Sequence, residues 1–252
     1  MSGDDYLYKI LAAQAVDTSA NSPVRSVQAT LAPLLRQWAG GQLLSVSPSG
    51  SFAKGTANRS GTDIDLFISL ASDTTESLKD VHATLFNALT NAGYQPKRQN
   101  VSLNIRVGGV DVDLVPAKHQ GNDSGDHSLY KRRGDTWMKT NVAKHIIVVR
   151  KAGRLSETRI LKLWRRQRGL DFMSFYLELT VIEALRNSKG TLSDNVWQVF
   201  RYLRDSFVGA QVVDPANTNN IISSDLTLAE KNLVRAAAVA TLGSKTWQDV
   251  VK

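Results

Sequence analysis

The chain has 252 residues, a formal net charge of +8 and no cysteine, which excludes disulfide scaffolds and thiolate metal sites and fits a reducing compartment. No apolar run approaches the roughly 20 residues that cross a bilayer, and the acidic start from Met1 to Asp5 does not resemble a secretory signal. We therefore expect a soluble, cytoplasmic protein with no membrane partner.

The positive charge gathers in short clusters at residues 97–98, 131–133 and 165–168. Such clusters suit polyanionic partners, which include nucleotides and nucleic acids. An ordinary solvated surface explains each cluster about as well. Charge alone therefore does not separate an RNA-binding protein from an enzyme that holds triphosphates.

In chain order, the N-terminal half alternates helices and strands. The first strong helix is expected from Pro23 to Trp38, where Ser22 can cap it and proline suits its first turn. A second helix follows a capping-box pattern and stops at Gly93. Alternating apolar residues predict strands over 43–46, 63–70, 101–107 and 110–115.

The C-terminal half reads as helical from about Trp137, after a polar segment at 118–136 that resembles a long loop. These patterns predict an α+β fold, with a strand-rich domain at 1–136 packed on a helical domain at 137–252. Apolar residues at helical spacing place the C-terminal helices at 142–152, 157–167, 175–186, 194–207 and 228–242.

The pattern with the clearest chemical meaning is an Asp-x-Asp strand that follows a Gly-Ser turn. Alternate residues of a strand share a face, so Asp63 and Asp65 place two carboxylates about 7 Å apart along one edge. Oxygen ligands of this kind favour Mg²⁺ or Mn²⁺. Phosphoryl transfer uses such ions to hold a triphosphate and to stabilise the attacking and leaving oxygens.

The strand at 110–115 supplies a third carboxylate, from Asp111 or Asp113, which can also take the acceptor's proton. In the turn, Gly50 lets backbone N–H groups approach phosphate oxygens, Ser51 adds a hydroxyl donor and Lys54 adds charge. An Asp-x-Asp pair alone is more often a cap or a solvated edge. The ordered combination of turn and two acidic strands is far more specific.

At these residues the chain resembles the polymerase-β-like nucleotidyltransferase superfamily. It looks most like the branch that contains oligoadenylate synthetases, cyclic GMP–AMP synthase, bacterial CD-NTases and archaeal CCA-adding enzymes. The third aspartate of that branch stands in an Asp-x-x-Pro stretch, which Asp113 to Pro116 matches, so the resemblance favours Asp113 over Asp111. It implies the superfamily's sheet with flanking helices, and two Mg²⁺ ions, replaceable by Mn²⁺, on catalytic Asp63, Asp65 and Asp113.

The resemblance continues through the helical half. The segment from Thr140 to His145 is similar to the Thr-Asn-Pro-x-x-His stretch of CD-NTases, with valine in place of proline. By the same resemblance Lys162 binds the triphosphate, Ser174 contacts phosphate and Phe175 stacks the base. From the residues alone, these three read equally well as a surface charge, a helix cap and a core side chain. The implied nucleotide-binding set is Gly50, Ser51, Lys54, Thr62, His145, Lys162, Ser174 and Phe175.

The leading hypothesis is an enzyme that transfers a nucleoside monophosphate from a nucleoside triphosphate to a hydroxyl group with release of pyrophosphate. ATP is the expected triphosphate. The product would be a cyclic or linear oligonucleotide, as in CD-NTase antiviral defence. One alternative is a template-independent RNA or tRNA 3′-end nucleotidyltransferase of the CCA-adding type, with RNA as acceptor or activator. The other is an inactive nucleotide or RNA sensor. The sequence does not indicate the base preference, the linkage type or the oligomeric state.

Overall fold

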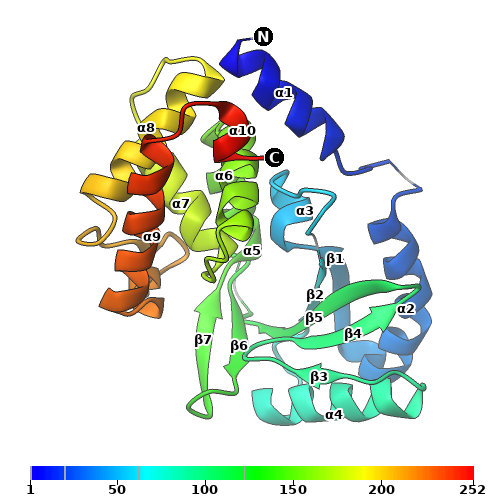
Figure 1. The fold of residues 1–252 in the computed structure, drawn as a ribbon. Helices are drawn as coiled ribbons and strands as arrows, with labels where there is room; N and C mark the ends of the chain where they lie inside the picture. Colours follow the sequence, from blue (N-terminus) through cyan, green and yellow to red (C-terminus); the bar gives the residue numbers. More distant parts are fainter. Residues whose placement is uncertain (1, 20, 62, 122) are drawn as a thin grey trace. The chain divides into compact units, whose positions relative to one another are not determined.

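The computed structural model describes residues 2–19, 21–61, 63–121 and 123–252 (Figure 1). The chain forms two compact units. The helical unit comprises Met1–Val16, Gly55–Gly61 and Ile147–Lys252, and the sheet unit comprises Asp17–Lys54 and Thr62–Ile146. The short segment Gly55–Gly61 therefore belongs to the helical unit, although the residues on both sides of it belong to the sheet unit.

The sheet unit is built on one mixed sheet, which has seven strands in the part of the chain described. Its strand order is β1-β2-β5-β4-β3, and β6 and β7 continue as a hairpin from the far end of β5. β2 pairs with β5 in parallel, and the other pairs are antiparallel. The strands are β1 (Leu43–Pro48), β2 (Ile64–Leu70), β3 (Lys97–Arg98), β4 (Leu103–Val107), β5 (Val110–His119), β6 (His127–Lys131) and β7 (Thr136–Thr140).

Two helices, α2 (Pro23–Ala39) and α4 (Leu78–Asn91), supply apolar side chains to the same core as the sheet. The hydroxyl of Ser22 accepts a hydrogen bond from Arg25 N at the start of α2, as predicted, whereas α4 is capped by Ser77. Two short helical segments, η1 (Gly40–Gln42) and α3 (Gly50–Lys54), flank β1. A further helix, α5 (Val142–Lys151), follows β7.

The helical unit encloses a core of large side chains, with Trp164, Tyr176, Phe200 and Phe207 fully buried. The N-terminal helix α1 (dark blue in Figure 1) contributes Leu7 and Leu11 to this core, and the sequence analysis had not predicted this helix. The elements are α1 (Gly3–Ala13), α6 (Leu155–Gln167), α7 (Ser174–Ala184), α8 (Leu192–Asp205), β8 (Val213–Asp214), β9 (Asn217–Ile221), η2 (Ile222–Asp225), α9 (Leu228–Leu242) and α10 (Trp247–Val250).

The predicted α+β fold is confirmed, but one of its segments was wrong. The stretch at 118–136, expected as a long loop, contains the end of β5, all of β6 and the first residue of β7. Its polar residues hid the strands, because a hairpin with one exposed face needs few apolar positions. The division of the chain into a strand-rich domain at 1–136 and a helical domain at 137–252 stays a prediction. None of the helices described has the length and apolar content that a membrane span requires.

Segment 55–61 is held in the helical unit by polar contacts. Thr56 donates to Glu178 Oε1 at 2.6 Å, and Lys162 Nζ donates to Thr56 Oγ1 at 2.8 Å and to Glu178 Oε1 at 2.6 Å. Asn58 exchanges hydrogen bonds with Arg159, donating to its carbonyl at 2.9 Å and accepting from its Nε at 3.1 Å. Lys162 and Glu178 are 9% and 0% exposed, so this is a buried ion pair.

Glu178→Ala should lower the free energy of unfolding by about 3–5 kcal/mol, because it removes the carboxylate from a buried pair. The double variant Lys162→Met with Glu178→Leu should regain most of that loss, since both charges leave together. Glu183→Ala, which breaks an exposed pair with Arg186 just beyond the end of α7, should lower the free energy of unfolding by less than about 1 kcal/mol. Urea unfolding followed by circular dichroism measures all three. Equal losses at Glu178 and Glu183 would contradict the structural role of the buried pair.

Candidate active site

The start of β2 carries the first two predicted carboxylates. Asp63 comes directly before the strand and Asp65 is its second residue. Ile64 and Leu66 alternate with them and are buried in the core of the sheet unit. The acidic side chains therefore leave the sheet on the face opposite to that core, as the alternation predicted.

The parallel neighbour β5 brings the third carboxylate alongside. Asp65 is in register with Asp113, and Ile64 with Val112. Neighbouring strands lie about 4.8 Å apart, so the two aspartates are adjacent across the ladder. On its other side Asp113 faces Asn104 of β4, whereas Asp111 faces Arg106. The register thus places Asp113, rather than Asp111, beside Asp65.

The carboxylates at this edge affect one another electrostatically. Partial burial raises the pKa of Asp63, and the charge of Asp111 raises it further. Burial also raises the pKa of Asp113; a hydrogen bond from Asn104 opposes this, and the charges of Asp63 and Asp111 add to it. Negative charge is therefore concentrated here, and a divalent cation would relieve the repulsion.

The donor set fits a hard cation such as Mg²⁺, because it consists of carboxylate oxygens. Within the described residues, no three His, Cys, Asp or Glu side chains are already arranged to hold an ion. The aspartates are thus neighbours in adjacent strands rather than a formed coordination shell. Their assignment as metal ligands stays a prediction.

The Gly-Ser turn packs directly against this edge. Ser49 N donates to the carbonyl of Asp65 at 2.8 Å. Gly50 has φ +55°, and a Cβ on it would lie 1.7 Å from Asp65 Oδ2. No other residue fits there without displacing the carboxylate. Ser51 is half-buried and Lys54 is only 7% exposed, and the predicted contacts of both residues with phosphate stay predictions.

The remaining predicted residues fall in both units. His145 lies half-buried on α5 in the sheet unit. Lys162, Ser174 and Phe175 belong to the helical unit. Lys162 is engaged with Thr56 and Glu178, as described above. Thr62 lies outside the described residues.

Ser174 and Phe175 begin α7. Ser174 Oγ accepts a hydrogen bond from Arg165 Nη2 at 3.1 Å, which places a guanidinium beside the predicted phosphate contact. Burial lowers the pKa of Arg165. Phe175 is half-buried against the helical core, so its predicted base-stacking role remains untested.

Sequence reasoning missed two polar residues at the acidic edge, Asn104 and Gln99, which both donate to Asp113. Asparagine is depleted in strands, and Asn104 stands at a polar position of the alternating segment 101–107, which was the available signal. The donation itself depends on the register of the β4–β5 hairpin, which the two-residue turn at Gly108 and Gly109 sets.

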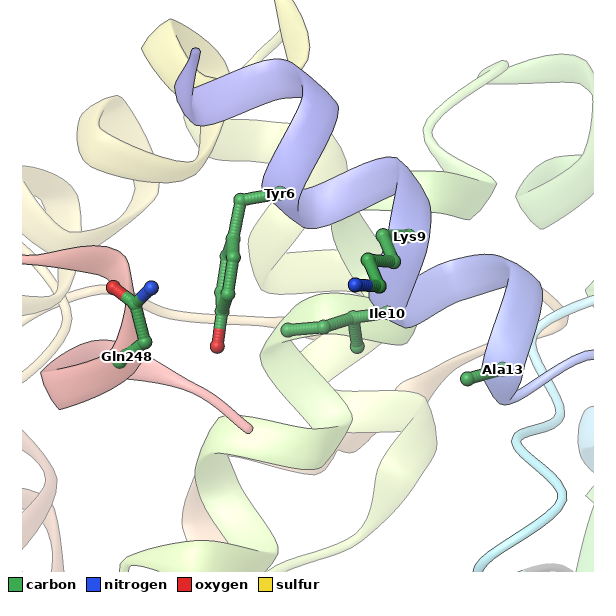
Figure 2. A pocket seen from close by; sticks show the side chains of 5 residues that line it. All are labelled: Tyr6, Lys9, Ile10, Ala13 and Gln248. Atoms are coloured by element: carbon green, nitrogen blue, oxygen red, sulfur yellow. The ribbon is translucent and has the colours of Figure 1, made fainter. Parts of the chain in front are cut away.

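A pocket of about 330 Å³ lies elsewhere, in the helical unit, and none of the predicted site residues lines it. Figure 2 shows its lining side chains on α1 and α10. Tyr6, one of them, donates through its hydroxyl to the carbonyl of Val251 at 3.0 Å. The pocket wall consists of Tyr6, Lys9, Ile10, Ala13 and Gln248.

The chain has the same fold as solved CD-NTases, and no family model matches it. CdnC of E. coli MS115-1, solved with ATP, is 22% identical with a TM-score of 0.79, over 99% of this chain and 97% of that one. CdnE of Elizabethkingia meningoseptica, a cyclic dinucleotide synthase solved with GTP and Apcpp, is 15% identical with a TM-score of 0.71, over 97% and 100%. The Cid1 poly(U) polymerase bound to MgATP is 12% identical with a TM-score of 0.68, over 97% and 95%.

Among curated proteins, the cyclic AMP-AMP-AMP synthase of Escherichia coli (strain MS 115-1) is 28% identical over 159 residues. The match covers 56% of this chain and 50% of that protein, so the chain aligns with about half of its relative. The relative and the solved structures confirm the resemblance and the fold that the sequence analysis predicted.

Gly50→Ala should lower turnover at least about 100-fold, because the added methyl group would displace the Asp65 carboxylate by more than an ångström. A non-glycine residue at φ +55° also strains the turn by about 1–2 kcal/mol. Gly41→Ala is the matched control, since a Cβ there meets nothing within 4 Å. Pyrophosphate release measures turnover. Equal activity of the two variants would show that the turn does not set the position of Asp65.

Proposed function

We propose that the protein is a magnesium-dependent nucleotidyltransferase that makes a cyclic or linear oligonucleotide from nucleoside triphosphates. An acceptor 2′ or 3′ oxygen forms a bond to the α-phosphorus of a triphosphate, the bond from that phosphorus to the bridging oxygen breaks, and pyrophosphate leaves. The observation that carries this proposal is the pairing of Asp65 with Asp113 in adjacent strands. Gly50 of the neighbouring turn lies so close to Asp65 that no other residue fits there.

The acidic edge divides the work among its residues. Asp63, Asp65 and Asp113 would hold two Mg²⁺ ions, or Mn²⁺, which supply the charge that phosphoryl transfer needs. Asp113 would also accept the acceptor's proton. Backbone N–H groups at Gly50 and the hydroxyl of Ser51 would orient phosphate oxygens.

The other predicted contacts complete the assignment. We assign Lys162 and Ser174 to phosphate binding and Phe175 to base stacking, with further contacts from Lys54, Thr62 and His145. In this assignment residues 1–136 form the catalytic domain and residues 137–252 complete nucleotide binding. Arg165 is added as a guanidinium that orients Ser174.

The similarity to a cyclic AMP-AMP-AMP synthase supports ATP as the substrate and a cyclic product. We also propose a cytoplasmic location, which suits a chain without cysteine, and a role in antiviral defence as in bacterial CD-NTases. An RNA acceptor draws no support from the CD-NTase relatives, and it enters as an outcome of the test.

The test is mass spectrometry of the products formed from mixed triphosphates with Mg²⁺, with and without tRNA. We expect small oligonucleotides and pyrophosphate without RNA, and none after chelation of the metal. Asp65→Asn should lower the rate at least about 1,000-fold, because the carboxylate is a proposed metal ligand. Asp73→Asn, an exposed aspartate, is the control and should keep the rate. Extended tRNA would favour the RNA-tailing alternative, and nucleotide binding without product would favour the sensor.

Substitutions of the two aspartates of β5 should have different effects on the rate in the same assay. Asp113→Asn should lower pyrophosphate release at least about 1,000-fold, because Asp113 is the register neighbour of Asp65. Asp111→Asn should keep the rate within about tenfold, because Asp111 is exposed and acts on the site only through its charge. Loss at Asp111 with activity kept at Asp113 would reverse the assignment of the third carboxylate.

A further inference from the structure

One oxygen of the Asp113 carboxylate receives two amide hydrogen bonds. Asn104 Nδ2 donates to Oδ1 at 2.8 Å, and Gln99 Nε2 donates to the same atom at 3.2 Å. No motif in the sequence marks either amide as part of a catalytic site. Both come from the side of β5 that is away from Asp65, because β4 pairs with β5 opposite β2.

The backbone and a buried serine hold these donors in place. Asn104 is the direct cross-strand partner of Asp113 in the antiparallel β4–β5 pair, so the ladder sets its position. Gln99 precedes β4, and its Oε1 accepts a hydrogen bond from Ser102 Oγ at 2.7 Å. Ser102 is 4% exposed. Its hydroxyl fixes the oxygen end of the Gln99 amide and turns the NH₂ end toward Asp113.

The arrangement leaves the other oxygen of Asp113 for a different ligand. Both amides use Oδ1, and in the part of the chain that the structure describes Oδ2 accepts no hydrogen bond. Amides are neutral, so they orient the carboxylate without cancelling its charge. A lysine or arginine in the same place would compete with a cation for that charge.

We propose that Asn104 and Gln99 are positioning residues that fix the Asp113 carboxylate with Oδ2 directed to the catalytic cation. This inference rests on the proposed nucleotidyltransferase function. Residues that orient a metal ligand in this way typically change metal affinity or activity by about 10–100-fold when they are lost. Because the two donors share one acceptor atom, each partly covers for the other.

The test replaces the amides by apolar side chains of similar size, in Asn104→Leu, Gln99→Met and the double variant. Asn87→Leu, at an exposed position on α4, is the matched control. Two readouts are compared: kcat and KM for ATP, and binding of Mn²⁺ in the presence of a non-hydrolysable ATP analogue, followed by the electron paramagnetic resonance signal of free Mn²⁺.

We expect Asn104→Leu to lower kcat and Mn²⁺ affinity by about 10–100-fold each, with KM for ATP changed less than about threefold. The double variant should lose more than either single variant. Leucine suits a strand better than asparagine, so the melting temperature should hold or rise. Wild-type Mn²⁺ affinity in the double variant would overturn the proposal, whatever the melting temperature.

The two readouts separate this inference from the proposed function. If the wild-type protein yields no product but its Mn²⁺ binding depends on Asn104, the proposed reaction fails and the positioning role stands. If the wild-type protein is active and Mn²⁺ affinity is unchanged when both amides are replaced, the proposed reaction stands and the positioning role fails.

Discussion

The parallel pairing of β2 with β5 is the constraint on which the candidate site depends. Side chains alternate along a strand, so a slip of one residue would turn Asp113 to the opposite face of the sheet. The buried pairs Ile64–Val112 and Leu66–Leu114 prevent that slip, because it would move apolar side chains out of the core. Residues of the core therefore determine which aspartates are neighbours, and core packing and the candidate site share a single register.

The same pairing gathers like charges, and the surrounding structure is arranged to tolerate them. Burial and mutual repulsion raise the pKa values of Asp63 and Asp113 and so favour their neutral forms. Amide donors on one side of Asp113 offset part of this effect without adding positive charge. At Gly50 the backbone approaches Asp65 closely enough to exclude any side chain. A cation bound at this edge would lower the repulsion between the carboxylates.

The sequence predicted well the alternation and motifs of single strands, and it missed features that arise from the pairing between strands. The alternation around Asp63 and Asp65 needs only strand geometry, and the Asp-x-x-Pro resemblance distinguished Asp113 from Asp111 before any register was known. The hairpin of β6 and β7 escaped because its polar strands lack the apolar alternation that marks a buried face. The role of Asn104 escaped for a different reason, since its partner is nine residues away across a ladder. The hairpin turn at Gly108 and Gly109 sets that pairing, but no motif marks the hydrogen bond between the two side chains.

The path of the chain adds a last consequence. Segment 55–61 belongs to the helical unit, although it connects the Gly-Ser turn to the first carboxylate, both in the sheet unit. Thr56 is held there by Lys162 and Glu178, and those charges are buried where an uncompensated ion would be strongly unfavourable. The buried pair therefore fixes the middle of a connection whose two ends carry Gly50 and Asp63. Lys162 has in this way a structural role in the helical unit that stands independently of any contact with a triphosphate.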